Sequence, residues 1–177
     1  MKKLKKIMLL VMTFSLSIFS SCSSDDDATP IVPIGPNSSA GQGIIVAKVD
    51  GVDFSSLEIT SYASKSTGGG QTTLVMQGNT QSQAINMIIN AYDGVGTYEL
   101  SDDNVFRSAS YIEPNISDPF NSQTWNAPYQ DSGLVGEIVI TEDSDTKVIG
   151  TFYFTCKNAN DNSIKNITDG AFDLNYQ

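Results

Sequence analysis

From residue 43 onward, apolar and polar residues alternate with a period of two, and glycines and acidic residues interrupt the alternation at short intervals. Successive side chains of a β-strand point to opposite faces, so this pattern predicts strands that each bury one face. The stretch "IIVAKVDGVDF" (44–54) places Asp50-Gly51 between two such runs, which predicts a tight β-hairpin. No window shows a helical period over a length that would predict a helix.

Further alternating runs follow along the chain. "SSLEITSYASKS" predicts a strand with Leu57 and Ile59 on one face, and "AINMIINAY" predicts another strand. The clearest run, "GEIVITEDSDTKVIGTFYFTCKN", predicts a hairpin with a polar turn over 142–146, and "DGAFDLNY" predicts the last strand. The side chains expected to share the inward face on these later runs are Ile85, Met87, Ile89, Ala91, Ile138, Ile140, Phe152, Phe154, Cys156, Phe172, Leu174 and Tyr176.

Taken together, the pattern predicts an all-β domain over residues 43–177. About nine or ten short strands of this kind suit a single antiparallel β-sandwich or a flattened barrel. Such a domain can bury a sufficient core without disulfides. Cys156 is therefore expected to be a small buried hydrophobe and not a reactive thiol.

The N-terminal residues have a different composition. A cationic start, with four lysines among the first six residues, precedes an apolar stretch over 7–19, and this is the layout of a signal peptide over 1–21. The following "SSC" resembles the processing site of bacterial lipoproteins, in which the cysteine is diacylated, although Ile18 or Phe19 stands where that pattern has leucine. The resemblance implies lipidation of Cys22; the alternative is an ordinary secretory signal that contains a cysteine.

Residues 22–42 follow as a Ser-, Asp- and Pro-rich segment with too little apolar surface to fold, which predicts a flexible tether. Within it, "CSSDDD" resembles the acidic signal that directs some lipoproteins to the outer face of the outer membrane. That resemblance implies surface display through Asp25, Asp26 and Asp27. The alternative is that these three aspartates are simply solvated.

Charge and composition restrict the partners. The chain carries 20 acidic and 10 basic residues, a net charge of −10. Removal of residues 1–21 would take four lysines and no acid, which leaves −14. Such a charge repels phosphate backbones, so we expect no nucleic-acid partner, and membrane attachment only through the lipid anchor. The chain has no histidine, which excludes His-based catalytic triads and His-ligated zinc, and nothing in it predicts a cofactor.

The domain resembles a group of small lipoprotein families of unknown function from gut and marine Gram-negative bacteria. The resemblance covers residues 44–176 and rests on "AKVDGVDF", "GTYEL", "GEIVIT", "VIGTFYFTCKN" and "ITDGAFDL". It implies an all-β domain on the cell envelope and transfers no catalytic residue.

One candidate binding site lies in "SASYIEPNISDPFNSQTWNAPYQDSG" (108–133), the longest stretch without a clear strand pattern. It contains Tyr111, Phe120, Trp125 and Tyr129, and exposed aromatic rings on loops could stack on the sugar rings of a glycan. The alternative is that these rings cover one end of the sandwich, or that part of the stretch is an edge strand.

A second candidate is the acidic turn "TEDSDTK", where Glu142, Asp143 and Asp145 offer oxygen ligands to calcium. It lacks the glycine and the final glutamate of an EF-hand loop, and the alternative is an ordinary acidic turn. The sequence favours a non-enzymatic binding or structural domain, with an envelope protein or a glycan as its partner. The alternatives are a glycan-binding accessory protein of a polysaccharide uptake system and a hydrolase whose carboxylate pair the sequence does not reveal.

Overall fold

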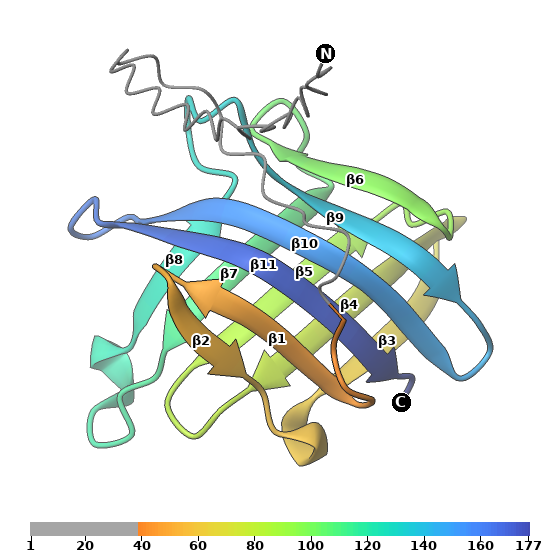
Figure 1. The fold of residues 1–177 in the computed structure, drawn as a ribbon. Coiled ribbons are helices and arrows are strands. Elements are labelled where there is room, and N and C mark those ends of the chain that lie inside the picture. The colour runs from red at the N-terminus through yellow and green to blue at the C-terminus, as the bar shows by residue number, and fades with distance from the viewer. Residues whose placement is uncertain (1–38) are drawn as a thin grey trace, which may run out of the picture. The chain divides into compact units, whose positions relative to one another are not determined.

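The computed structural model describes residues 39–177, which form eleven β-strands and two three-residue 3-10 helices (Figure 1). The all-β prediction is confirmed, with eleven strands in place of nine or ten. Within the described residues, no helix has the length and apolar character needed to cross a membrane. The elements are β1 (Ile44–Val49), β2 (Val52–Ser55), η1 (Glu58–Thr60), β3 (Tyr62–Gly68), β4 (Gln71–Asn79), β5 (Ala84–Asn90), β6 (Gly96–Ser101), β7 (Arg107–Glu113), η2 (Pro119–Asn121), β8 (Gln123–Ala127), β9 (Leu134–Asp143), β10 (Lys147–Asn158) and β11 (Ile164–Asn175).

The strands form one curled antiparallel sheet in the order β2-β1-β11-β10-β8-β7-β5-β4-β3, and β9 and β6 extend it from β10. Strand β10 is the branch point, because it pairs with β9 over Val148–Phe154 and with β8 only at Lys157 and Asn158. The sheet therefore folds over into two layers, a front layer of β2-β1-β11-β10-β9-β6 and a rear layer of β8-β7-β5-β4-β3 (Figure 1). A parallel bridge between Ala63 and Tyr176 joins β3 to the chain end.

The predicted hairpin at Asp50-Gly51 is confirmed, since β1 pairs with β2 on either side of these two residues. Both have positive φ angles, 50° at Asp50 and 83° at Gly51, as a tight primed turn requires. The Asp50 carboxylate also accepts a hydrogen bond of 2.9 Å from the backbone N–H of Asn166. This turn is therefore fastened to β11.

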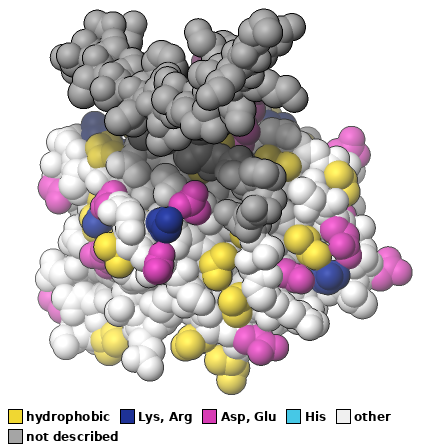
Figure 2. Space-filling view, in the orientation of Figure 1, with side chains coloured by type: hydrophobic (Ala, Val, Ile, Leu, Met, Phe, Trp, Pro, Cys, Tyr) yellow, Lys and Arg dark blue, Asp and Glu magenta, His cyan; other side chains and the backbone are white. Residues whose placement is uncertain are grey.

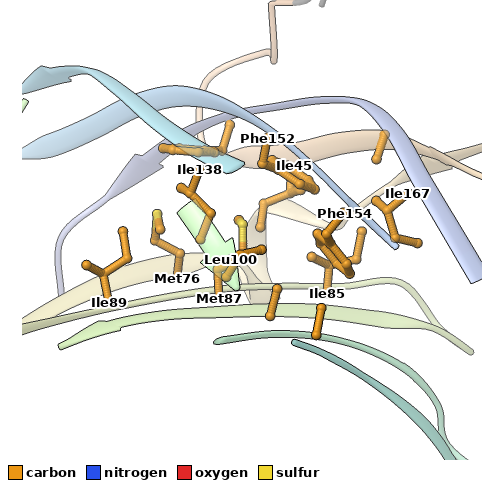
Figure 3. Close-up of a cluster of buried hydrophobic side chains, with 14 of the residues drawn as sticks. Ile45, Met76, Ile85, Met87, Ile89, Leu100, Ile138, Phe152, Phe154 and Ile167 are labelled. Carbon is orange, nitrogen blue, oxygen red and sulfur yellow. The ribbon is translucent and has the colours of Figure 1, made fainter. Parts of the chain in front are cut away.

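The core lies between the two layers. Ile85 and Met87 of the rear layer face Ile138, Phe152 and Phe154 of the front layer (Figure 3). The side chains that the alternation predicts to face inward on the later strands are buried, apart from Ala91 and Tyr176. Ala91 is exposed because β5 ends at Asn90 and the chain turns there with a positive φ of 53°, and Tyr176 is partly buried. Cys156 is among the buried side chains, and burial raises the pKa of its thiol to about 12, so the thiolate that reacts with oxidants or metals is scarce at neutral pH.

Two further expectations about local structure are wrong. Leu57 and Ile59 do not lie on a strand. Leu57 directly precedes the 3-10 helix η1 and Ile59 lies within it, and the two residues are 44% and 89% exposed. The chain crosses from the front layer to the rear layer there. Short polar side chains hold the crossing, since the hydroxyls of Thr60 and Ser61 both donate to the Leu57 carbonyl, at 3.1 and 2.7 Å.

The stretch 108–133 is also more regular than expected. It contains most of β7 and all of β8, which lie within the rear layer and leave only 114–122 and 128–133 as connections. Its strand pattern is weak because small residues occupy many positions, and only Ala109, Tyr111, Trp125 and Ala127 face the core. The predicted signal peptide, Cys22 and the three aspartates of the tether lie outside the described residues.

Candidate functional site

A compact group of polar side chains lies at one end of the sandwich, and we call Lys65, Tyr92, Asp143 and Tyr176 the Asp143 cluster. The Asp143 carboxylate accepts three hydrogen bonds: 2.6 Å from Lys65 Nζ, 2.7 Å from the Tyr176 hydroxyl and 2.9 Å from the Tyr92 hydroxyl. The Lys65 ammonium also lies 4.3 Å from the centroid of the Tyr176 ring, within cation–π distance. The cluster thus joins two phenols and one ion pair around one carboxylate.

Four separate elements bring these side chains together. Lys65 follows buried Ala63 by two positions on β3, so it points to the same side of the strand near its outer end. Asp143 ends β9 at the turn into β10, and Tyr176 follows the last residue of β11. Tyr92 comes directly after Ala91, whose positive φ of 53° ends β5 and redirects the chain. The cluster therefore exists only when both layers are assembled.

The electrostatics of the cluster favour one protonation state. Burial on its own raises the pKa of Asp143, but the hydrogen bonds from Lys65, Tyr176 and Tyr92 outweigh it and hold the pKa below its usual range. Burial and the neighbouring Asp143 carboxylate raise the pKa values of the Tyr92 and Tyr176 phenols above their ordinary range. At neutral pH the carboxylate is ionised and both phenols keep their protons.

This arrangement can hold elements in place but offers little to a substrate. A carboxylate has about four lone-pair positions, and three of those on Asp143 are already occupied. A general base needs an oxygen within hydrogen-bond reach of the proton that it removes. The geometry of the Asp143 cluster is therefore that of a clamp between strands.

The structure separates the three acids of the calcium candidate. Asp143 turns into the cluster, whereas Glu142 lies 3.7 Å from the Lys147 ammonium and Asp145 is exposed in the turn. Within residues 39–177, no three His, Cys, Asp or Glu side chains come together in a way that could hold a metal ion. The carboxylates of this turn thus do not form a common site.

The four aromatic residues proposed for ligand binding also lie apart. Tyr111 is fully buried and Trp125 is 5% exposed, with their ring centroids 5.6 Å from each other. Phe120 of η2 is completely exposed, and the half-buried Tyr129 ring lies 5.7 Å from the Lys157 ammonium. The Tyr111 and Trp125 rings are covered by protein atoms, as the packing interpretation expected of them, so the four rings do not share one exposed surface.

Hydrogen bonds fasten the two buried rings. The Trp125 indole N–H donates to the Ser163 hydroxyl at 2.8 Å, and the Tyr111 hydroxyl donates to Glu113 at 2.9 Å. Lys165 lies 3.1 Å from Asp50 and 5.5 Å from the centroid of the Trp125 ring. These contacts close the end of the sandwich opposite the Asp143 cluster, because Trp125 pairs with the last residue of β10 whereas Asp143 pairs with Val148 near its start.

A groove of about 280 Å³ lies beside β1 and β2. The Lys48–Asp169 ion pair, 3.0 Å long, is part of its wall. The groove is slightly smaller than the range of typical ligand pockets, and the Lys48–Asp169 pair occupies two of its four polar lining positions. Asp53 and Ser55 also line it, beside the apolar side chains of Val46, Ala47 and Phe54.

Sequence reasoning identified Asp143 but not Lys65, Tyr92 or Tyr176. The one available signal was the alternation in the last strand, which placed Tyr176 on the side of Phe172 and Leu174. Lys65 and Tyr92 had no signal, because their contacts with Asp143 span 78 and 51 residues of chain.

Comparison with known proteins gives one match. The model of a family described as a domain of unknown function (DUF6252) matches residues 42–173, from just before β1 to within β11. No curated protein and no solved structure matches the chain.

Proposed function

The chain belongs to the DUF6252 family of domains of unknown function, and we propose that it is a lipid-anchored lipoprotein displayed at the surface of the outer membrane. In this proposal the β-domain is a non-enzymatic binding or structural module of the cell envelope. Cys22 carries the acyl chains, and Asp25, Asp26 and Asp27 direct export to the outer face.

The observation that carries the proposal is the position of Cys22. A cationic and then apolar stretch precedes it, and β1 begins only at Ile44. If residues 22–42 form the flexible tether that their composition predicts, they span on the order of 25 Å, enough to hold the domain clear of the lipid headgroups. Two or more acyl chains hold a protein at a membrane stably, so the anchor would not need a basic surface.

The contacts of two reactive side chains, Asp143 and Cys156, support the non-enzymatic part of the proposal. The carboxylate of Asp143 is engaged by Lys65, Tyr92 and Tyr176, and the Cys156 thiol lies in the core. The chain also lacks histidine, the commonest general base. Asp143 and Cys156 therefore serve the fold.

Metabolic labelling with palmitate tests the anchor. We expect the wild-type chain to incorporate label and the Cys22→Ser variant to incorporate none, because the acyl chains need the thiol. Cys156→Ala is the matched control and should keep full labelling, since Cys156 is buried in the folded domain. An unlabelled wild-type chain, or label retained by Cys22→Ser, would contradict lipidation.

Protease added to intact cells tests display. We expect cleavage within the tether of the wild-type chain and protection of a variant with Asp25, Asp26 and Asp27 replaced by asparagine. The same variant should be cleaved after the outer membrane is permeabilised. This control shows that the protease can still cut the tether when the three aspartates are replaced. Protection of the wild-type chain on intact cells would place the domain on the inner leaflet.

A further inference from the structure

The rear layer turns one side of its five strands to the core and the other side outward. Its outward side chains carry no charge on any of the strands β3, β4, β5, β7 and β8. We call this surface the neutral face, and it consists of Tyr62, Ser64, Ser66, Thr73, Val75, Gln77, Asn79, Ala84, Asn86, Ile88, Asn90, Ser108, Ser110, Ile112, Thr124 and Asn126.

The front layer is different. Acidic and basic side chains are both visible on the side of the molecule that faces the viewer in Figure 2. Lys48 pairs with Asp169 there at 3.0 Å, and Lys147 lies 3.6 Å from Asp173. Charged residues make up 17% of the chain, so five neighbouring strands without an outward charge depart from its composition.

The strand register aligns polar groups across the neutral face. Gln77 lies opposite Asn86, Asn86 opposite Ser110, and Ser110 opposite Asn126, so one row crosses four strands. With neighbouring strands about 4.8 Å apart, the row is roughly 15 Å long. Tyr62 lies opposite Gln77 and adds an aromatic ring at the edge of the sheet.

This row keeps hydrogen-bonding capacity of both kinds. Amides and hydroxyls can each donate and accept. Within residues 39–177, the Ser110 hydroxyl and the Asn126 amide bond to no other group, whereas Asn86 Oδ1, also without a partner, is buried from solvent. Gln77 uses only its oxygen, which accepts a long contact of 3.5 Å from the Tyr62 hydroxyl.

We propose that the neutral face is a docking surface for an uncharged glycan chain. Sugar hydroxyls donate and accept hydrogen bonds at regular intervals, which matches the row of amides and hydroxyls, and the Tyr62 ring could stack on a sugar face. No lysine or arginine points outward from these strands to pair with sulfate, phosphate or carboxylate, and the net charge of −10 repels polyanions. The chemistry therefore selects a neutral polymer.

The size of the face argues against a second copy of this chain as its occupant. Five strands about 4.8 Å apart, each with about seven residues at 3.4 Å, cover roughly 600 Å². A stable protein interface buries about 800 Å² on each partner and concentrates aromatic, methionine and arginine residues, of which this face has only Tyr62. An extended polymer needs less area because it can bind many anchored copies at once.

The neutral face would be the binding surface of the module in the proposed function, and uncharged glycans would be its ligands. This inference rests on the proposed function for the location of the domain at the cell surface. Native affinity electrophoresis of the full-length chain in detergent tests it, with dextran, a β-1,3-glucan or galactomannan in the gel, and alginate as the polyanion. We expect at least one uncharged polymer to retard the wild-type chain and alginate to leave it unretarded. The double variant Ser110→Ala with Asn126→Ala should weaken the retardation at least threefold.

The front layer offers a matched control. Thr155 and Asn166 also place a hydroxyl opposite an amide, in directly paired positions of β10 and β11. The double variant Thr155→Ala with Asn166→Ala should keep wild-type retardation. Both double variants are first shown by thermal unfolding to be folded.

Four results would overturn the inference: no retardation by any of the three uncharged polymers, retardation by alginate alone, equal weakening in both double variants, or a dimer that Ser110→Ala with Asn126→Ala dissociates in sedimentation. The labelling and protease experiments do not depend on glycan binding. A chain that is lipidated and displayed but binds no glycan would contradict only this inference. A chain that binds glycan but is not lipidated or displayed would contradict only the proposed function.

Discussion

The side chain of Asp143 holds together the strands at one end of the domain. Its carboxylate receives donors from Lys65 of β3, Tyr92 after β5 and Tyr176 after β11. Buried donors that lose their acceptor keep the full cost of their desolvation. The residue that looked like part of a calcium site therefore acts as the common acceptor for the ends of three other elements.

Replacing Asp143 by asparagine should destabilise the domain by about 2 kcal/mol, since hydrogen bonds to a charged group are worth about 1.5–3 kcal/mol each and the amide retains some of them. Urea unfolding of the variant measures the loss. Asp145→Asn is the matched control in the same turn, and because Asp145 is exposed it should change stability by less than about 0.5 kcal/mol. Equal effects of the two substitutions would contradict the clamp.

Acid should remove this stabilisation. The pKa of Asp143 is lowered in the folded state, so the unfolded chain binds the proton first as pH falls below about 3.9. The contribution is thus complete above that value and is lost as pH falls through the lower pKa of the folded state. Urea unfolding of wild type and Asp143→Asn from pH 6 to pH 2 should show their difference shrink only below about pH 4. A difference that stays constant to pH 2 would show that the charge of Asp143 contributes nothing.

Strand β10 is the element on which the architecture depends. It pairs with β11 along its length, with β9 over most of it and with β8 at its end, and so it connects the front layer to the rear layer. Its register against β9 shifts between Ile149 and Gly150. At Gly150 a side chain would meet the Val139 carbonyl oxygen and lie 2.5 Å from the ring of Phe172. The absence of a side chain there lets three strands approach one another.

Gly150→Ala should therefore destabilise the domain by about 3 kcal/mol, because the added methyl group must displace backbone or an aromatic ring of the core. Gly68→Ala is a suitable comparison, since a Cβ at Gly68, the last residue of β3, would meet no atom within 4 Å. We expect that variant to unfold within about 0.5 kcal/mol of wild type. Similar urea midpoints for both variants would mean that β10 tolerates a side chain at position 150.

Within the described residues, one hydrophobic core joins the two layers, and Figure 3 shows part of it. Tyr92 of the Asp143 cluster and Trp125 at the opposite end are both members of it. A single core that both layers complete leaves neither layer able to bury its inner face alone. The two layers are therefore expected to unfold together.

Trp125 makes this testable, since it is the single tryptophan. Its fluorescence reports on the end of the sandwich opposite Asp143, and far-UV circular dichroism reports on all strands. The two urea transitions should coincide, as in two-state unfolding, and Asp143→Asn should shift both by the same amount. A Trp125 transition that stays in place while the dichroism transition moves would show that the two ends unfold independently.

The strand pattern was readable where one face is strongly apolar. In β5 and β10, inward isoleucine, methionine and phenylalanine alternate with mostly polar residues, so the period alone locates the strand and its buried face. In β7 the inward positions include Ala109 and the polar-tipped Tyr111, and the contrast between the faces is too small to detect. Around Leu57 the alternation is present but misleading, because the chain turns there to change layers.

Local order was thus encoded in the chain: alternation selects strands, Asp50-Gly51 selects a turn, and the absence of histidine limits the chemistry. Assembly settled the rest, since the Asp143 cluster and the neutral face each combine residues from strands far apart in the chain. The physical reason is that alternation specifies which side of a strand is buried, whereas neighbours across strands depend on register and strand order. Those follow from packing both layers around one core.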